Sequence, residues 1–260
     1  MFRAIRGDDT HLNPSSLFNI CLRLVTKNIN DAEPYAFVDL PSYIKRKIVR
    51  RTTRYVFRKT NVGFKNEELL KALLDREMIS LNLTNSTITN YTINNVAEIC
   101  TNLHELLLDE VRCTLTEDEL QEFLPKMKFL RLLNLKGVYA VTDKSISGLV
   151  TLTYLNHLVL KSCSRLTDGC IATLRNIKLQ RLDMSCTQIT DEWIGSLEFS
   201  PLYETVFDLN LSFCKNLTNR KLCALNWSKL KYLGLLGIDD IQFMDDVNEL
   251  KSVFWSVPLV

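Results

Sequence analysis

Hydrophobic residues recur along this chain in blocks of one pattern, with apolar residues, mostly leucine, at the first, fourth and sixth places and often cysteine at the ninth. Leu155, Leu158, Leu160 and Cys163 make up one such copy. Apolar residues at alternate places over so short a stretch are typical of a β-strand with one buried face. The copies follow one another every 24–27 residues and start at Met78, Leu103, Leu130, Leu155, Leu179, Val206 and Leu230. A repeat with a period in this range predicts a solenoid of stacked units.

A second pattern follows each predicted strand and marks the start of a helix. In Ile189-Thr190-Asp191, for example, the threonine and aspartate precede apolar residues at helical spacing. Threonine, aspartate and asparagine favour helix starts because their side chains accept hydrogen bonds from the free backbone N–H groups there. The pattern recurs at residues 88–90, 115–117, 141–143, 166–168 and 217–219. Each unit therefore predicts a strand, a turn and a short helix, and the chain as a whole an α/β fold.

This unit resembles the leucine-rich repeat of the cysteine-containing type, over roughly residues 78–240. The resemblance implies a horseshoe of about seven repeats in which Cys163 and Cys214 pack as small structural residues under the next turn. One repeat cannot bury its own apolar face, so the two ends of the stack need caps. We expect the apolar tail at 253–257, which contains Trp255, to cap the carboxyl end. We therefore assign residues 78–260 to a repeat domain with a carboxyl-terminal cap.

Residues 1–77 do not follow the repeat and differ from it in charge. They contain 15 Lys and Arg against 9 Asp and Glu, a net charge of +6, whereas the rest of the chain carries −4. A helix is predicted after Asn13-Pro14, because proline favours the first helical position. One stripe of this helix contains Leu17, Cys21, Leu24 and Val25. A second helix is predicted from Leu40-Pro41 onward, and its apolar face contains Ile44, Ile48 and Tyr55.

Two short motifs in these helices, at residues 16–25 and 40–48, resemble the two parts of a VHL box. Ser16-Leu17-x-x-x-Cys21-x-x-x-Val25 resembles the BC box, which docks on Elongin C. Leu40-Pro41-x-Tyr43-Ile44-x-x-x-Ile48 resembles the cullin 2 box. The chain is also similar to the antagonist-of-mitotic-exit network protein family and to the leucine-rich-repeat part of the Zyg and Zer receptors. The resemblance implies an adaptor-binding set of Leu17, Cys21, Val25, Leu40, Pro41, Ile44 and Ile48.

By the same resemblance, the chain is expected to be a non-catalytic substrate-recognition subunit of a cullin-RING ubiquitin ligase. Its partners would be Elongin B and Elongin C, cullin 2 and a protein substrate, in the cytoplasm, the nucleus or both. Two alternatives stay open. The second motif also fits the opening of an F-box, which would bind Skp1 and cullin 1, although residues 49–64 lack the acidic residue and the Cys/Trp element usual there. Alternatively, both helices merely cap the solenoid, and the chain is a protein-interaction scaffold without a ligase link.

Polar residues between and after the inward-facing leucines are expected to line the concave face of the solenoid. Equivalent residues of successive repeats would lie about 5 Å apart, as neighbouring strands do. A rigid polar surface of this kind can bind a protein with little loss of conformational entropy. We therefore expect the protein target to contact Asn134, Lys136, His157, Lys161, Arg181, Asp183, Asp208 and Asn210.

Composition and motifs argue against other functions. The chain is 46% hydrophobic and 24% charged, with a net charge of +2, and it lacks the run of about 18 apolar residues that a membrane span needs. No secretory signal is present, so the eight cysteines are expected to be reduced. The three histidines form no zinc-type cluster with them. No nucleotide-binding or hydrolase motif occurs, so we expect no metal, cofactor or catalysis. The basic second helix lacks the aromatic platform typical of nucleic-acid binding.

Overall fold

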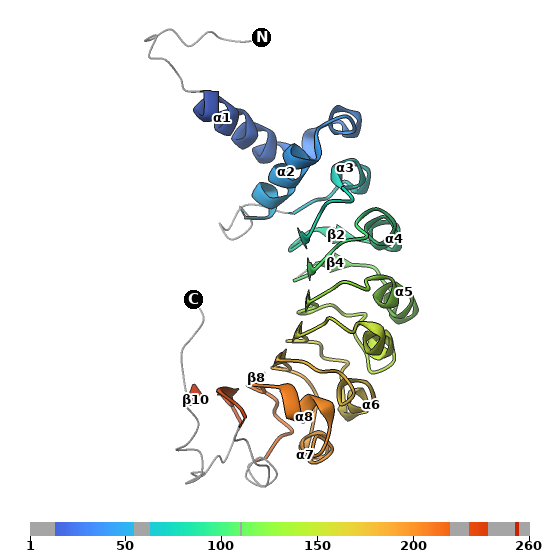
Figure 1. Ribbon diagram of the computed structural model, residues 1–260, viewed down its shortest axis with the longest axis vertical. Coiled ribbons are helices and arrows are strands. Elements are labelled where there is room, and N and C mark those ends of the chain that lie inside the picture. The colour runs from blue at the N-terminus through green and yellow to red at the C-terminus, as the bar shows by residue number, and fades with distance from the viewer. Residues whose placement is uncertain (1–13, 55–62, 110, 219–228, 239–252, 255–260) are drawn as a thin grey trace.

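The computed structural model describes residues 14–54, 63–109, 111–218, 229–238 and 253–254. The chain forms a curved stack of repeats, with strands along its concave side and helices along its convex side (Figure 1). This arrangement confirms the predicted α/β solenoid of the leucine-rich-repeat type. Two residues of the sequence analysis, Tyr55 and Trp255, lie outside the described residues.

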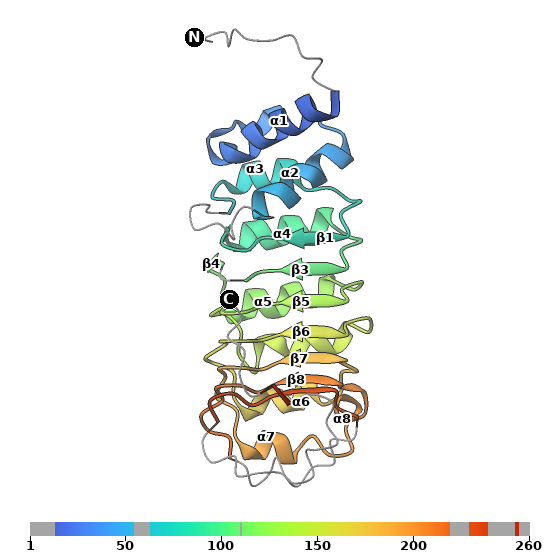
Figure 2. The ribbon, with the colours of Figure 1, turned by 90° about the vertical axis from the view of Figure 1, so that its left-hand side faces the viewer.

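The concave side is one parallel sheet of eight strands, seen as a ladder in Figure 2. In sheet order the strands are β1 Ser80–Asn82, β3 Glu105–Leu107, β5 Leu132–Asn134, β6 His157–Val159, β7 Arg181–Asp183, β8 Asp208–Asn210, β9 Tyr232–Gly234 and β10 Val253–Phe254. The first seven fall on the seven predicted copies. The central leucine of each copy pairs with that of the next, from Leu81 through Leu158 to Leu233. This register makes the core continuous from repeat to repeat.

The convex side carries a row of short helices, with one or two helices in each segment between successive strands of the main sheet from β1 to β8. They are α4 Asn90–Ile99, α5 Glu117–Phe123, η4 Leu124–Lys126, η5 Ser145–Thr151, η6 Asp168–Cys170, α6 Ile171–Leu174, α7 Asp191–Gly195 and α8 Pro201–Thr205. A smaller parallel pair, β2 Thr87–Ile88 and β4 Arg112–Cys113, lies between the first helices and the main sheet. The predicted threonines are N-caps: Thr116, Thr167 and Thr190 each accept a backbone N–H of the following turn.

Carboxylates at these helix starts also join consecutive repeats. Asp168 accepts the backbone N–H of Thr190 at 2.7 Å and the Thr190 hydroxyl at 2.6 Å. Both bonds are charge-assisted, which makes them stronger than bonds between neutral groups. The same pairing joins Asp143 to Thr167 and Asp191 to Thr218. The Thr-Asp pattern therefore caps a helix within one repeat and ties that repeat to the next.

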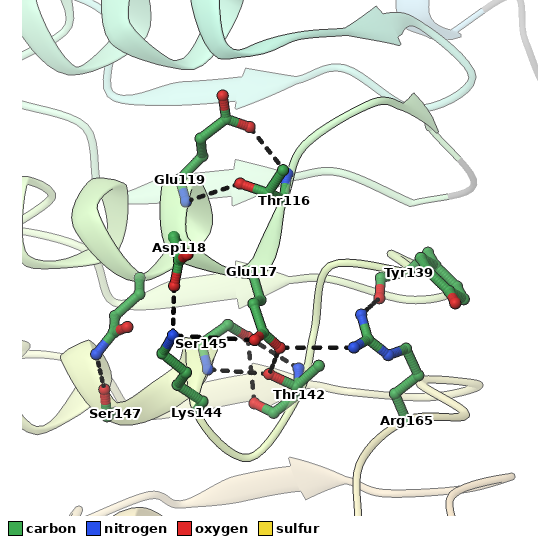
Figure 3. A network of polar contacts seen from close by, with 11 residues as sticks. Thr116, Glu117, Asp118, Glu119, Tyr139, Thr142, Lys144, Ser145, Ser147 and Arg165 are labelled. Atoms are coloured by element: carbon green, nitrogen blue, oxygen red, sulfur yellow. Dashed lines mark hydrogen bonds and ion pairs between the residues drawn. The ribbon is translucent and has the colours of Figure 1, made fainter.

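In an earlier repeat a glutamate takes the place of this aspartate (Figure 3). Glu117 accepts the Thr142 hydroxyl at 3.0 Å, and its carboxylate lies 3.5 Å from the Arg165 guanidinium. The neighbouring Asp118 pairs with Lys144 at 2.5 Å. These ion pairs are solvent-exposed, so we assign them a small share of the stability and the buried leucines a larger one.

The two cysteines at the ninth repeat position have the predicted packing role. Cys163 is 1% exposed and its thiol donates to the backbone oxygen of Leu135, one repeat earlier, at 3.3 Å. Cys214 is fully buried and donates to Met184 in the same way at 3.2 Å. Burial raises the pKa of the Cys163 thiol to about 12, so the thiolate does not form at neutral pH. Both residues are inert parts of the core.

The amino-terminal segment closes the first end of the stack. It consists of α1 Pro14–Lys27, η1 Ile29–Asp31, η2 Pro34–Phe37, α2 Ser42–Arg54 and α3 Glu67–Leu73. The helix α3 packs against α4 and so serves as the first helix of the convex row (Figure 1). Buried residues of the segment, from Leu22 to Leu74, belong to the same core as the repeats. The predicted boundary at residue 77 therefore marks a change in sequence pattern and no break in the core.

The tail adds one more strand, β10, at the carboxyl-terminal end of the sheet. Val253 pairs with Leu233 and Phe254 with Gly234, both in parallel orientation, so β10 covers the edge of β9. The sequence contains a signal for this strand, because Leu250-x-x-Val253-x-Trp255 repeats the spacing of the earlier leucines. We expected a cap at this place, and the described part of the tail, Val253–Phe254, continues the sheet by one strand.

Candidate functional site

The first candidate surface is an apolar stripe on α1, the outermost helix of the stack (Figures 1 and 2). Leu17 is 52% exposed and Leu24 is 56% exposed. Residues at spacings of three and four lie on one face of a helix. The docking stripe, as we name this face, consists of Leu17, Ile20, Cys21, Leu24 and Val25, all exposed to solvent. Ile20 was not in the predicted set, although its spacing of three from Leu17 indicates it.

The opposite side of α1 holds the helix on the rest of the protein. Leu22 is 8% exposed, and the buried Thr26 donates its hydroxyl to the Leu22 backbone oxygen at 2.9 Å. Beyond the helix, Asn30 donates to the Gly63 oxygen at 3.1 Å and accepts the Lys65 N–H at 2.9 Å. The contacts of this side with α2, and the bonds of Asn30, hold α1 in place on the side away from the docking stripe.

The second motif, at 40–48, is less accessible than the first. Ile48 is 3% exposed and belongs to the core, so its predicted contact with an adaptor is wrong for this conformation. The physical reason is that the apolar face of α2 packs against α1 and β1. Leu40 and Ile44 are half-buried against the same core, whereas Pro41 and Tyr43 are exposed. The other face of α2 is basic, as predicted, and its Arg46 pairs with Glu77 at 2.7 Å.

The second candidate surface is the concave sheet, where the predicted polar residues do form rows. His157, Arg181 and Asp208 are consecutive partners in one row across β6, β7 and β8. Two places further along the strands, Asp183 and Asn210 are partners in a second row. The remaining predicted residues of this face belong to the same rows or follow their strands: Asn134, Lys136 and Lys161.

Part of this face maintains the fold. The side-chain oxygen of Asn134 accepts the Lys136 N–H at 2.9 Å, and Asp183 and Asn210 accept the N–H two residues further on at 2.9 and 3.0 Å. Such local bonds stabilise the turn after each strand. Lys136 also pairs with Asp109 at 3.2 Å. These residues therefore have a role in the turns, and their contact with a target stays a prediction.

A depression of about 380 Å³ lies at the amino-terminal ends of the strands. Its floor includes the strand residues His157 and Arg181, which the sequence predicted. The residues just before the strands were missed. They lie at the second place of each repeat copy, and those that line the depression include Arg131, Asn156, Gln180 and Phe207. A comparison of the second residue of each repeat copy would have identified these lining residues from the sequence.

Burial and neighbouring charges shift the pKa values of two groups in this row, His157 and Asp208. Burial, and then the positive charge of Arg181, lower the pKa of His157, while Asp208 and Asp183 partly oppose this shift. Burial raises the pKa of Asp208, against the opposing effect of Arg181. Because His157 titrates below its ordinary value, it is neutral at pH 7, and the fixed positive charge of the depression comes from the arginines.

The geometry of the described residues, 14–54, 63–109, 111–218, 229–238 and 253–254, also bears on metal binding and on membrane spanning. Within it, no group of three or more His, Cys, Asp and Glu side chains is arranged to hold a metal ion. No helix there is both long and apolar enough to pass through a bilayer.

Comparisons with known proteins give no family. No protein-family model matches the chain, and no curated protein sequence matches it. Among solved structures, the internalin InlF from Listeria monocytogenes is 19% identical with a TM-score of 0.48; the match covers 75% of this chain and 51% of that one. This chain thus spans about half the length of InlF. Internalin C2 from the same organism is 21% identical over 71% of this chain and 70% of that one, with a TM-score of 0.41.

A third similar structure is a yeast complex of Rad7 and Elc1, 11% identical, with 93% of this chain and 94% of that one covered and a TM-score of 0.32. Similarities at these scores support no argument about function. The leucine-rich-repeat architecture rests on the strand register and the buried leucines described above.

Proposed function

We propose that this protein is a non-catalytic substrate-recognition subunit of a cullin-RING ubiquitin ligase, present in the cytoplasm, the nucleus or both. In this proposal the docking stripe of α1 binds Elongin C, which brings Elongin B and cullin 2, and the concave face holds a protein target. The chemistry of ubiquitin transfer belongs to the partner complex. The observation that carries the proposal is the exposure of Leu17, Ile20 and Leu24 on a helix that is anchored by its opposite side.

The physical argument concerns the free energy of exposed apolar surface. Burying a leucine side chain is favourable by about 2 kcal/mol, and yet three large apolar residues of this stripe are about half in water. Contiguous apolar patches on folded proteins mark interaction sites. A helix with anchors at spacings of three and four docks into an apolar groove of a partner. The stripe therefore fits a helix-in-groove contact.

The choice of Elongin C follows from the resemblance to the BC box. Leu17, Cys21 and Val25 match its apolar positions, and all three are exposed on the same face of α1. The proposed cullin contact involves fewer residues than the motif suggests, because Ile48 is buried in the core. It would rest on Pro41 and on the exposed parts of Leu40 and Ile44.

The F-box alternative is less well supported. It relies on the second motif alone, of which Ile48 is buried and Ile44 half-buried, and it gives the docking stripe no role. The scaffold alternative, in which the two helices only cap the stack, accounts for the buried side of α1 and leaves its exposed side unexplained.

Co-purification tests these readings. The tagged protein is isolated from cells and probed for Elongin C, cullin 2 and Skp1, alongside a variant with Leu17→Ala and Cys21→Ala. The matched control is Arg23→Ala, an exposed residue of α1 outside the stripe. We expect Elongin C and cullin 2 with the wild type and the control, and their loss from the double variant. Skp1 in place of Elongin C, or Elongin C retained by the double variant, would contradict the proposal.

A further inference from the structure

The depression on the concave face has hydrogen-bonding groups that the fold does not use. Polar side chains that line it include Glu105, Arg131, Asn156, Gln180 and Arg181. In the described part of the chain, none of these side chains makes a hydrogen bond or an ion pair. The neighbouring row is different, because Asn134, Asp183 and Asn210 are bonded to their own turns. The polar groups of the depression are thus left for a ligand.

The two arginines lie on either side of one strand, β6. Arg131 precedes β5 and Arg181 begins β7, while Asn156 and His157 lie on the rung between them. Strands are about 4.8 Å apart, so the two arginine backbones are about 10 Å apart. Both side chains are exposed and long enough to reach a group bound over the middle rung. A guanidinium offers a planar pair of N–H donors that matches a carboxylate or a phosphate.

One of the two arginines is already held in place. The Arg181 guanidinium lies over the ring of Phe207 at 5.7 Å, and Lys231 lies over the same ring at 5.3 Å. A cation over an aromatic ring is attracted by the ring's charge distribution. This contact reduces the number of conformations that Arg181 must give up when it binds a ligand. The amides of Asn156 and Gln180 supply further donors beside it.

We propose that this depression binds an extended segment of the target protein through one anionic side chain, carboxylate or phosphate, held between Arg131 and Arg181. A volume of about 380 Å³ is at the lower end for ligand sites, which suits one or two side chains of a peptide. Glu105 belongs to the same row on β3, and Asp208 on β8 is the strand partner of Arg181, so both carboxylates would repel a strongly acidic run. The site is therefore selective for a single anion flanked by uncharged residues. The inference rests on the proposed function only in assigning the concave face to the target.

Peptide libraries provide the test. Three degenerate libraries with a fixed central glutamate, phosphoserine or serine are passed over the immobilised full-length protein, and the retained peptides are quantified. The variants are Arg131→Gln with Arg181→Gln, and the control Lys178→Gln, which removes a positive charge from an exposed residue that does not line the depression. A single-stranded oligonucleotide is added as a competitor. Because no adaptor is present, the result is independent of Elongin C binding.

We expect one anionic library to be retained about tenfold better than the serine library, since a charge-assisted hydrogen bond has that effect or more. The preferred library distinguishes carboxylate from phosphate. The preference should be lost in the double arginine variant and kept in Lys178→Gln. It should be reduced in Phe207→Leu, which keeps both arginines and removes the ring under Arg181. Equal retention of all three libraries, an unchanged preference in the double variant, or stronger retention of the oligonucleotide would overturn the proposal.

Discussion

Leu17 and Leu22 lie on different sides of the same helix, and only one of them belongs to the core: Leu17 is 52% exposed and Leu22 is 8% exposed. Leu22 follows Leu17 by five residues, which is about one and two fifths helical turns, so one side packs against α2 while the other faces solvent. This relationship separates the residues of α1 that maintain the fold from those available to a partner, and it makes the two roles separable by mutation.

The first prediction concerns stability. Leu22→Ala should lower the free energy of unfolding by about 2–4 kcal/mol, because it leaves a cavity between α1 and the rest of the core. Leu17→Ala should change it by less than about 0.5 kcal/mol, since the side chain is half in water. Urea denaturation of both variants measures the difference. Equal losses of unfolding free energy in the two variants would contradict this account, because they would mean that Leu17 is packed against the protein as closely as Leu22.

The second prediction concerns the coupling between repeats. Asp168→Ala removes the acceptor for both the N–H and the hydroxyl of Thr190 and should destabilise the protein by about 1–3 kcal/mol. Glu198→Ala, at an exposed carboxylate for which no such bond is found, is the matched control. A double-mutant cycle with Thr190→Val isolates the hydroxyl bond. An Asp168 variant as stable as the control would show that the carboxylate is fully replaced by water.

The third prediction concerns a left-handed backbone position that recurs after the strands. Gly137 has φ of +69° with no atom near its missing side chain, whereas a side chain at Gly237, φ +68°, would meet the Phe213 ring at 2.4 Å. Gly137→Ala should destabilise by about 1 kcal/mol through backbone strain alone. Gly237→Ala should destabilise by more, because the Phe213 ring must also move. Thermal unfolding of the two variants compares them, and a smaller effect at Gly237 would contradict this account.

The fourth prediction concerns pH. The folded protein holds His157 below its ordinary pKa, so the unfolded chain binds a proton at a pH where the folded one does not. Stability contributed by neutral His157 is therefore present above about pH 6.5 and is lost as the pH falls toward its folded pKa. His157→Gln should flatten the decline in stability between about pH 7 and pH 5. A variant with the same decline as the wild type would assign it to other groups.

The sequence predicted the solenoid well because its leucines recur at positions that all face inward, so each copy repeats the evidence of the last. It also predicted the threonine N-caps, since that chemistry is local. It did not predict the fate of Ile48, because an amphipathic pattern identifies an apolar face without saying whether the chain itself covers it. The helix α3 was not recognised as part of the convex row, since no repeat strand precedes it.

The depression was only partly predictable for a related reason. His157 and Arg181 are outward strand positions and were found, whereas Arg131 and Gln180 lie at the second place of their repeat copies, which the sequence analysis did not compare between repeats. Likewise, Asn134 and Asp183 have the polarity of binding residues, and only the structure reveals that their oxygens bond to the turns that follow.

The most direct test of the account is calorimetric titration of the full-length protein with purified Elongin B–Elongin C heterodimer. We predict saturable binding to the wild type and to Arg23→Ala. For Leu17→Ala with Cys21→Ala we predict a loss of about tenfold or more in affinity, since burial of each anchor contributes on the order of 1–2 kcal/mol. The free energy of unfolding of this double variant should match that of the wild type. Absence of binding to the wild type, or equal binding by the double variant, would contradict the assignment of the α1 stripe to Elongin C.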